Sequence, residues 1–402
     1  MIASADGSPL IEYPVSSQVN NYTLAKIKRS DFRDDFAFGA ATSAYQIEGA
    51  WNVGSKGMSI WDVFTQKQPG GIADGSNGCV AIDHYNMFRE DVTLMKKLGL
   101  NSYRFSIAWS RILPGGRLCT GIDKDGIKFY NDLIDALLTA GIEPYVTLFH
   151  WDVPQCLEED YGGFLSEKIV KDFCEFAEIC FWEFGDRVKY WITLNEPWSF
   201  SVQGYATGAF PPNRGKHPTT TGEATTHSRL HRGRSRHHIA CKYGDPGTEP
   251  YRVAHNLILS HAYAVDIYKA KYQEKYQNPV IYITENGVDE VNDKSKSGAQ
   301  CLSDEMRIHY FQDHLYNLKQ AMNQGVNVKG YFIWSLFDNY EWAAGYTVRF
   351  GIIYVDYVNG RYTRLPKNSA VWLRKFLTKK VVNPANKEAE KADERRKRLR
   401  SG

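Results

Sequence analysis

Two glutamates in this chain each follow a short apolar, β-branched run. Glu196 comes just after the run 190–194, and Glu285 comes just after the run 280–283. If both runs are parallel strands, the two carboxylates lie at the same edge of a sheet. Two carboxylates about 5–5.5 Å apart can cleave a glycosidic bond with retention, because one protonates the leaving oxygen while the other attacks the sugar carbon. The pattern therefore predicts Glu196 as the acid/base and Glu285 as the nucleophile.

Strand-like and helix-like segments alternate from about residue 35 to residue 380. Short apolar runs are separated by amphipathic segments, which is the pattern of a parallel α/β fold. The predicted core strands lie near 36–41, 102–107, 145–149, 190–194, 280–284 and 328–334. Helices are predicted at 91–98, 129–140, 166–185, 251–276 and 304–323. Residues 199–250 are predicted to form a long loop tract with a basic, histidine-rich centre.

The segment between the two glutamates is short for a complete barrel. A (β/α)8 barrel has eight strands, each followed by a helix, and needs roughly 250 residues. One strand–helix–strand step takes about 30 residues, and the loop tract with one helix fills most of the segment 196–285. One crossover fits there, and three do not. We therefore predict an α/β fold of the (β/α)8 TIM-barrel type that is incomplete, with about six core strands and a deletion near 277–279.

Six motifs, in order along the chain, resemble those of one known family. They are Ser43–Gly49 (SAYQIEG), Tyr103–Arg111 (YRFSIAWSR), Phe149–Asp152 (FHWD), Thr193–Pro197 (TLNEP), Ile283–Gly287 (ITENG) and Trp334–Trp342 (WSLFDNYEW). From about 31 to 375 the chain resembles glycoside hydrolase family 1, the β-glucosidases built on the (β/α)8 barrel. It is most similar to the plant raucaffricine- and strictosidine-type glucosidases, which act on monoterpenoid indole alkaloid glucosides. The resemblance implies that barrel strands 5 and 6 are absent, together with the family's Asn-Tyr-Tyr-Thr segment.

The same resemblance implies which residues bind the glucosyl group. The substrate-binding side chains would be Gln46, His150, Trp151, Asn195, Trp334, Glu341 and Trp342. Amides and carboxylates suit sugar hydroxyls because they supply acceptors in fixed geometry. Arg104 would orient Glu285 and lower its pKa, while Glu196, beside Trp198, would hold its proton in a partly apolar cleft. Taken singly, each of these residues could instead be a satisfied core residue.

The predicted function is that of a retaining β-glucosidase. Its substrate would be a β-D-glucoside with an apolar, monoterpenoid indole alkaloid aglycone, and no metal or cofactor would be needed. The alternative is a catalytically impaired short form that acts as an interaction partner or modulator of full-length glucosidase subunits. That alternative follows from the shortened barrel, because exposed strand edges are templates for pairing with another chain. A homo- or hetero-oligomer with full-length homologues would then form.

Composition and spacing argue against other partners. The net charge of +3 is too small to favour nucleic acid. No continuous apolar run of about 18 residues occurs, so no membrane span is predicted. Neither the seven cysteines nor the residues His231, His237 and His238 have the spacing of a zinc site.

The two ends of the chain differ from its centre. We expect a flexible leader at 1–24, the glycosidase barrel at 25–380 and a charged basic tail at 381–402. The first residues lack the basic start and apolar run of a secretory signal. The run Arg395–Arg400 is typical of a nuclear import signal. A nuclear or cytoplasmic location is therefore expected.

Overall fold

One parallel sheet carries the structure. The computed structural model describes residues 27–215, 242–272, 280–296, 298–357 and 360–378. The sheet has six strands, namely β1 (Ala37–Ala41), β2 (Ser102–Ser106), β3 (Glu143–Phe149), β4 (Tyr190–Leu194), β7 (Ile281–Asn286) and β9 (Val328–Trp334). Neighbouring strands are parallel throughout. The predicted strands are therefore confirmed to within a few residues.

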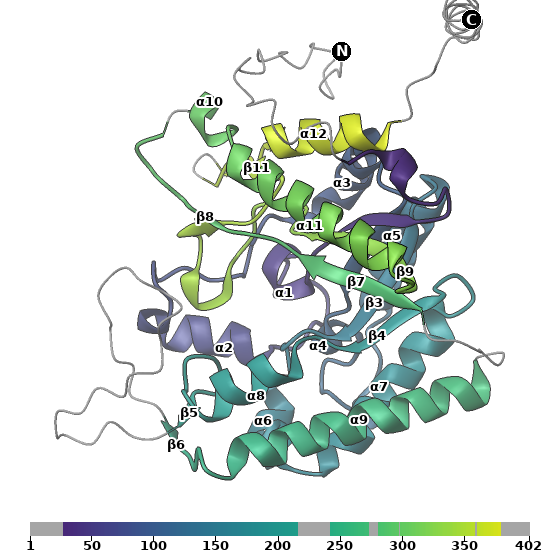
Figure 1. The fold of residues 1–402 in the computed structure, drawn as a ribbon. Coiled ribbons are helices and arrows are strands. Elements are labelled where there is room, and N and C mark those ends of the chain that lie inside the picture. The colour runs from purple at the N-terminus through teal and green to yellow at the C-terminus, as the bar shows by residue number, and fades with distance from the viewer. Residues whose placement is uncertain (1–26, 216–241, 273–279, 297, 358–359, 379–402) are drawn as a thin grey trace, which may run out of the picture.

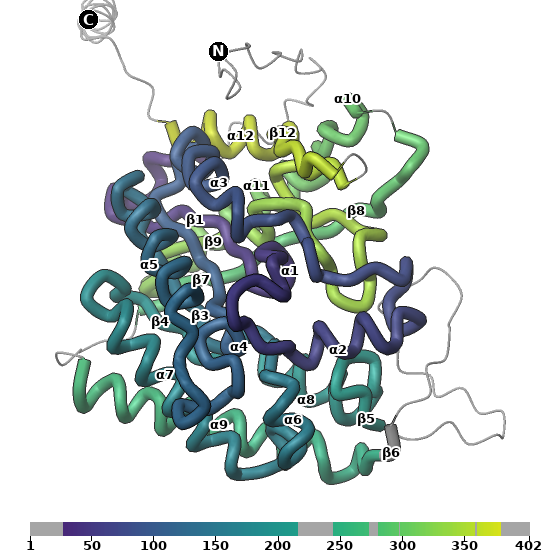
Figure 2. The backbone as a smooth tube through the Cα atoms, turned by 180° about the vertical axis from the view of Figure 1, so that it is seen from behind, coloured from purple at the N-terminus to yellow at the C-terminus, as the bar shows by residue number. Residues whose placement is uncertain are grey.

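Each strand of the sheet is followed by a helix that packs on its outer face (Figure 1, Figure 2). These helices are α3 (His84–Leu98), α5 (Lys124–Thr139), α7 (Lys168–Phe184), α9 (Glu249–Lys271), α11 (Glu305–Asn323) and α12 (Asn368–Leu377). In α7, residues Ile169, Phe173, Phe176 and Cys180 recur at helical spacing and are fully buried. Helix α3 ends at Gly99, whose left-handed φ of 81° suits a residue without a side chain.

Shorter elements lie in the loops between these units. The helices are α1 (Ala44–Ile47), α2 (Ile60–Lys67), α4 (Trp109–Ile112), α6 (Gln155–Tyr161), α8 (Pro197–Tyr205) and α10 (Gly298–Cys301), with 3-10 turns at Arg29–Asp31, Pro69–Gly71, Leu118–Thr120, Gly163–Leu165 and Trp342–Ala344. Three strand pairs are β5 (Arg214–Gly215) with β6 (Lys242–Tyr243), β8 (Glu290–Val291) with β10 (Val348–Arg349), and β11 (Ile353–Val355) with β12 (Arg364–Pro366). Helix α8 corrects the prediction that 199–250 is loop throughout. Pro197 stands at its start, where a missing backbone N–H costs nothing.

The sheet curls into an open, incomplete barrel. Its strand order is β4-β3-β2-β1-β9-β7, so β1 pairs with β9 while β4 and β7 form the two ends. Strands β1 and β2 are buried along their whole length, whereas every residue of β4 is partly exposed. The greater exposure follows from the missing neighbours, because an end strand has a sheet partner on one side only. The predicted incomplete barrel is thus confirmed.

Several predictions concern segments outside the described residues. These are the leader 1–24, the tail 381–402, most of the tract 214–242 and the deletion near 277–279. They stay predictions. Among the helices that the structure does describe, none has the length and apolar character required to cross a membrane.

Candidate active site

Arg104 lies at the centre of the predicted site and contacts three other strands. This β2 side chain is only 1% exposed. Its Nε donates to Thr147 Oγ1 of β3 at 3.0 Å, and its Nη2 donates to Asn195 Oδ1 at 2.8 Å. Its Nη1 forms the ion pair with Glu285 of β7. The guanidinium therefore joins the two ends of the sheet, as its planar set of donors allows.

The bond from Arg104 determines the hydrogen bonding of two further predicted residues. Because Arg104 can only donate, the Asn195 oxygen must face it and the Asn195 amide nitrogen must point the other way. That nitrogen lies 3.1 Å from His150 Nε2 and donates to it. The proton of His150 is then on Nδ1, which is buried without a protein partner. Burial, with Arg104 nearby, lowers the pKa of His150 well below its ordinary value, so the ring is neutral.

Three tryptophans surround His150. The rings of Trp334 and Trp342 are stacked on His150, each with a centroid distance of 5.9 Å and tilts of 14° and 13°. Trp151 packs against Trp342 at 4.8 Å, and its indole nitrogen donates to the Asn195 carbonyl at 2.9 Å. Trp151 therefore braces the backbone of Asn195, and its only N–H is unavailable to a sugar hydroxyl.

Gln46 and Glu341 form a second group of predicted sugar ligands. Gln46 Nε2 donates to Glu341 Oε2 at 3.2 Å and to the Tyr340 carbonyl at 2.9 Å. Its Oε1 accepts a bond of 2.6 Å from Ser43. Burial, followed by the charges of Asp289 and Glu285, raises the pKa of Glu341 to about 8. This carboxyl group is therefore largely protonated at neutral pH and can donate as well as accept.

The environment of Glu285 corrects one prediction. Arg104 does act to lower the pKa of Glu285, but burial acts more strongly, and the charge of Glu196 also raises it. The pKa of Glu285 is therefore raised rather than lowered. The two carboxylates therefore lie close enough for the charge of Glu196 to affect Glu285.

Glu196 itself lies at the surface, which corrects the prediction of a partly apolar cleft. Its backbone is left-handed, with φ of 37°, at the start of α8. Its side chain is exposed, and its Oε2 accepts a bond of 2.7 Å from Ser199. Trp198, expected to shield it, is 70% exposed. The reason is that β4 ends the sheet, so no further strand covers this corner.

Gly287 makes possible the close approach of the segment after Glu285 to the segment that begins at Trp334. The backbone after Glu285 passes directly against the carbonyl of Trp334, and a Cβ at position 287 would collide with that oxygen. Glycine is therefore required where the loop after Glu285 and the Trp334–Trp342 loop meet.

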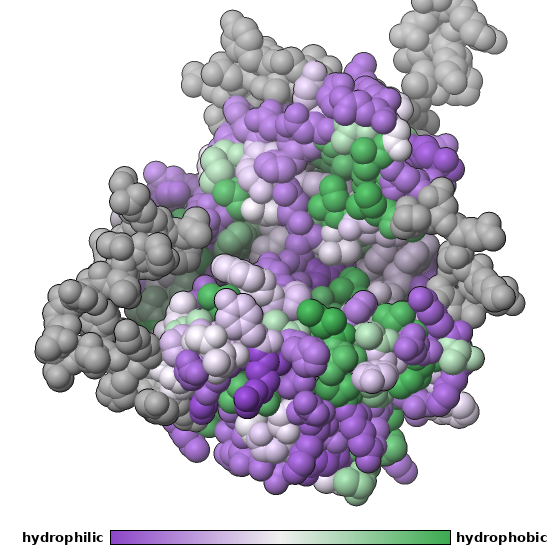
Figure 3. Space-filling model, turned by 60° about the horizontal axis from the view of Figure 1, so that its bottom comes forward, coloured by the Kyte–Doolittle hydropathy of each residue, from purple (hydrophilic) through white to green (hydrophobic). Residues whose placement is uncertain are grey.

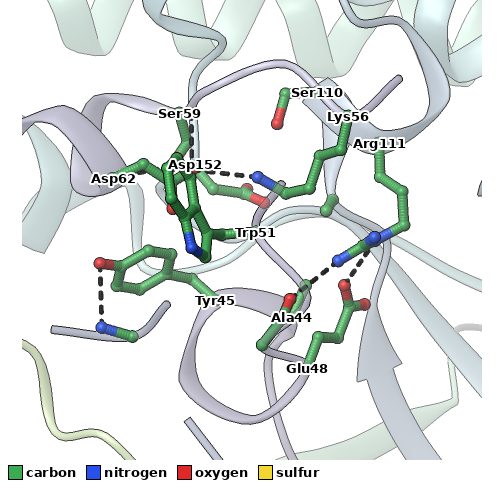
Figure 4. A pocket seen from close by; sticks show the side chains of 13 residues that line it. Ala44, Tyr45, Glu48, Trp51, Lys56, Ser59, Asp62, Ser110, Arg111 and Asp152 are labelled. Atoms are coloured by element: carbon green, nitrogen blue, oxygen red, sulfur yellow. Dashed lines mark hydrogen bonds and ion pairs between the residues drawn. The ribbon is translucent and has the colours of Figure 1, made fainter. Parts of the chain in front are cut away.

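A small polar pocket adjoins the site (Figure 4). It lies among residues of the motifs that hold Gln46 and His150. Its buried atoms Asp62 Oδ1, Ser110 Oγ and Asp152 Oδ1 have no protein partner. Lys56 pairs with Asp62 at 3.0 Å. Burial, reinforced by the charge of Glu48, raises the pKa of Asp152 to about 7, and backbone hydrogen bonds and the charge of Lys56 oppose this rise only in part.

The predicted site residues thus form one contiguous cluster, but sequence reasoning missed three of their supports. Thr147 is a buried polar residue in an apolar strand, which was the available signal for it. Asp152 was visible within the FHWD motif, although its pocket was not. Ser199 lies one turn beyond Glu196. In the described part of the chain, no group of three or more His, Cys, Asp or Glu side chains has an arrangement suited to a metal ion.

An incomplete parallel α/β barrel that carries two acidic side chains at the carboxyl ends of its two end strands has the arrangement of a barrel-type glycoside hydrolase. Residues 28–275 and 270–382 match the model of glycosyl hydrolase family 1. The chain belongs to this family, as the sequence motifs predicted.

Individual relatives agree with this assignment. The chain is 50% identical over 542 aligned positions to oleuropein beta-glucosidase from Olea europaea, covering 100% of this chain and 98% of that protein. It is 39% identical to raucaffricine-O-beta-D-glucosidase from Rauvolfia serpentina, with 94% and 97% covered. The solved structure of the rice Os3BGlu6 beta-glucosidase superposes with a TM-score of 0.79 at 34% identity, covering 88% of this chain and 100% of that one. The first alignment is longer than the 402 residues of this chain, so the relative contains segments that this chain lacks.

Replacing Asp152 should change how stability depends on pH. Because folding raises its pKa to about 7, the folded protein holds this proton more tightly than the unfolded chain does. The free energy of unfolding therefore falls as pH rises from about 4, the ordinary value for aspartate, to about 7. Asp152→Asn should flatten this fall, as measured by urea unfolding at a series of pH values. Asp186→Asn, at a side chain that is 69% exposed, should keep the wild-type slope. An Asp152→Asn slope equal to the wild type would show that Asp152 is not protonated on folding.

Proposed function

We propose that this protein is a retaining β-glucosidase that works by a two-glutamate double displacement. The observation that carries the proposal is the bridge by Arg104, which pairs with Glu285 of β7 and bonds to Asn195, the neighbour of Glu196. A retaining enzyme needs its nucleophile and its acid on opposite sides of one glycosidic bond. The buried Arg104 side chain therefore binds both Glu285 itself and Asn195, the residue before Glu196.

In the proposed mechanism, Glu285 attacks the anomeric carbon while Glu196 donates its proton to the leaving oxygen. The glycosyl–Glu285 ester is then hydrolysed by a water molecule that Glu196 deprotonates. Asn195, which bonds to Arg104 and to His150, is proposed to hold the sugar 2-hydroxyl. The Nδ1–H of His150, a buried donor without a protein partner, is proposed to bind another sugar oxygen.

The proposed substrate has an apolar, monoterpenoid indole alkaloid aglycone. Two relatives are named raucaffricine-O-beta-D-glucosidase and ipecac alkaloid beta-glucosidase 3, and the second name supports an alkaloid glucoside as the substrate. Oleuropein beta-glucosidase, at 50% identity, supports oleuropein as the second substrate to be assayed. The exposed Trp198, next to Glu196, offers an apolar surface on the side where the leaving group departs.

A second role is favoured by the two unpaired strand edges. Strands β4 and β7 end the sheet, and apolar side chains near them are exposed, including Ile281 of β7 (46%) and Ile258 of α9 (62%). Figure 3 displays apolar surface on both sides of a hollow on this face. In this role the chain pairs with a full-length glucosidase subunit and alters its assembly or its activity.

We also propose a nuclear or cytoplasmic location. The support is the basic run Arg395–Arg400, which lies outside the described residues.

Covalent trapping tests the enzymatic proposal. A 2-deoxy-2-fluoro aryl glucoside with an activated leaving group should label Glu285. The fluorine slows both formation and hydrolysis of the glycosyl–enzyme, whereas the good leaving group keeps formation fast, so the intermediate accumulates. Peptide mass spectrometry locates the label. Glu159→Gln, at an exposed glutamate of α6, should be labelled like the wild type, whereas Glu285→Gln should not. A folded wild-type protein that takes up no label would end the proposal.

Mixing tests the second role. With oleuropein beta-glucosidase as the full-length partner, the two chains should co-elute on size exclusion, and the rate of the partner should change. Ile281→Lys places a charge on the β7 edge and should abolish co-elution. Val53→Lys, at a residue that is 44% exposed elsewhere, should leave it intact. Separate elution at all ratios, with an unchanged rate, would argue against this role.

A fluorescent fusion tests the location. The full chain should accumulate in nuclei, and replacing the basic residues of 395–400 with alanine should leave the fusion in the cytoplasm. Secretion of the fusion would contradict both proposed locations.

A further inference from the structure

The distance between the two proposed catalytic glutamates is not set by strand pairing. Glu196 follows β4 and Glu285 lies in β7, and these strands are the two opposite ends of the sheet. In a closed barrel, a continuous ladder of hydrogen bonds fixes the positions of all strands. Here β4 and β7 do not pair with each other, and the hydrogen-bond ladder connects them only through the four strands β3, β2, β1 and β9. Another interaction must hold the two ends together.

Three tyrosines meet across this opening. Tyr190 of β4 and Tyr282 of β7 contact each other edge to face, with ring centroids 5.6 Å apart. Tyr145 of β3 stacks on Tyr190 at 4.2 Å with a tilt of only 7°. It also touches Tyr282 at 5.4 Å. We call these three residues the tyrosine clamp.

The surrounding residues make room for the clamp. Phe332 of β9 packs on Tyr145 at 4.7 Å, and the cluster that contains both is separate from the main core. Gly330 stands beside Tyr282 in register, and a Cβ there would lie 2.6 Å from the Tyr282 ring. The absence of a side chain at position 330 thus lets the ring of Tyr282 turn inward.

We propose that the tyrosine clamp takes the place of the missing strand pairing and positions Glu285 relative to Glu196. Tyr282 is three residues before Glu285, and Tyr190 is six residues before Glu196, on the same two strands. Aromatic pairs of this geometry attract each other beyond the effect of burial. The clamp contacts β4 and β7 at residues that precede those bonded to Arg104. The clamp and the Arg104 bridge therefore connect these two strands at two separate places. This inference rests on the proposed β-glucosidase function for its kinetic test but not for its structural test.

The clamp should affect the carboxylate pair without affecting sugar binding. Gln46, His150 and Glu341 follow β1, β3 and β9, which are joined through β2 and β1 by continuous pairing. Loosening β7 against β4 leaves these strands in place. A weaker clamp should therefore lower kcat and leave KM nearly unchanged. A residue that only stabilised the fold would reduce the amount of active enzyme without changing the kcat of folded molecules.

The structural test is zero-length cross-linking of the folded wild-type protein. Light with a ruthenium tris-bipyridyl complex and persulfate couples tyrosine rings that are in contact. Digestion and mass spectrometry should recover dityrosine between the peptides of Tyr282 and Tyr190 or Tyr145. The stacked pair Tyr145–Tyr190, on adjacent strands, serves as the internal positive control. Recovery of the control pair without any link to Tyr282 would overturn the clamp whether or not the protein is an enzyme.

The kinetic test compares three variants on an aryl β-glucoside, with glucose binding measured separately by calorimetry. Tyr282→Leu should lower kcat by about 10- to 100-fold, since a displacement near 1 Å can cost about 100-fold, while KM and glucose affinity stay within about threefold. Tyr282→Phe keeps the ring and should restore most of the rate even if the leucine variant folds poorly. Tyr251→Leu, at a tyrosine of α9 that is 75% exposed, is the matched control.

Two outcomes would overturn the positioning role. One is a folded Tyr282→Leu variant with the kcat of Tyr251→Leu, and the other is a rise in KM at unchanged kcat. A wild-type protein with no glucosidase activity at all would instead remove the proposed function, and the cross-linking result would still decide the clamp.

Discussion

The buried guanidinium of Arg104 is the interaction on which the arrangement of this site depends. A charge removed from water is tolerated only where partners satisfy it, and removal of a partner leaves an uncompensated charge. Thr147, Asn195 and Glu285 provide those partners from three directions. The need to satisfy one cation therefore forces β3, β4 and β7 to converge. It also orients Asn195, and through Asn195 it selects the tautomer of His150.

Because the sheet is open, Arg104 must help to connect its two end strands. In a closed barrel, strand number and stagger set the radius, and the radius sets how far apart strand ends lie. A six-stranded open sheet lacks this constraint between β4 and β7. Side chains replace the backbone there, with Arg104 at the carboxyl ends of the strands and the tyrosines farther down. One consequence of the open sheet is that the side chain of Glu196 is exposed to solvent, whereas a partly apolar cleft was expected around it.

Burial dominates the electrostatics of the cluster. It is the largest cause of the raised pKa values of Glu285, Glu341 and Asp152. Acids with raised pKa values near one cleft are typical of functional sites. Arg104 is the cation that counteracts burial at Glu285, and Lys56 has the same role at Asp152. Neither cation restores an ordinary pKa, because burial is the larger effect at both carboxyl groups.

Local sequence patterns by themselves determined the elements and the identity of the site residues. Apolar runs and helical spacing located the six strands, and the motifs around Glu196 and Glu285 named the family, because both signals are carried by neighbouring residues. Helix α8 was missed since a short helix behind Pro197 has little periodicity. The tertiary structure alone decided the exposure of Glu196, the raised pKa of Glu285 and the meeting of Tyr190 with Tyr282. These properties depend on residues far apart in the chain and on where the sheet is open, and no local pattern encodes a contact across a gap.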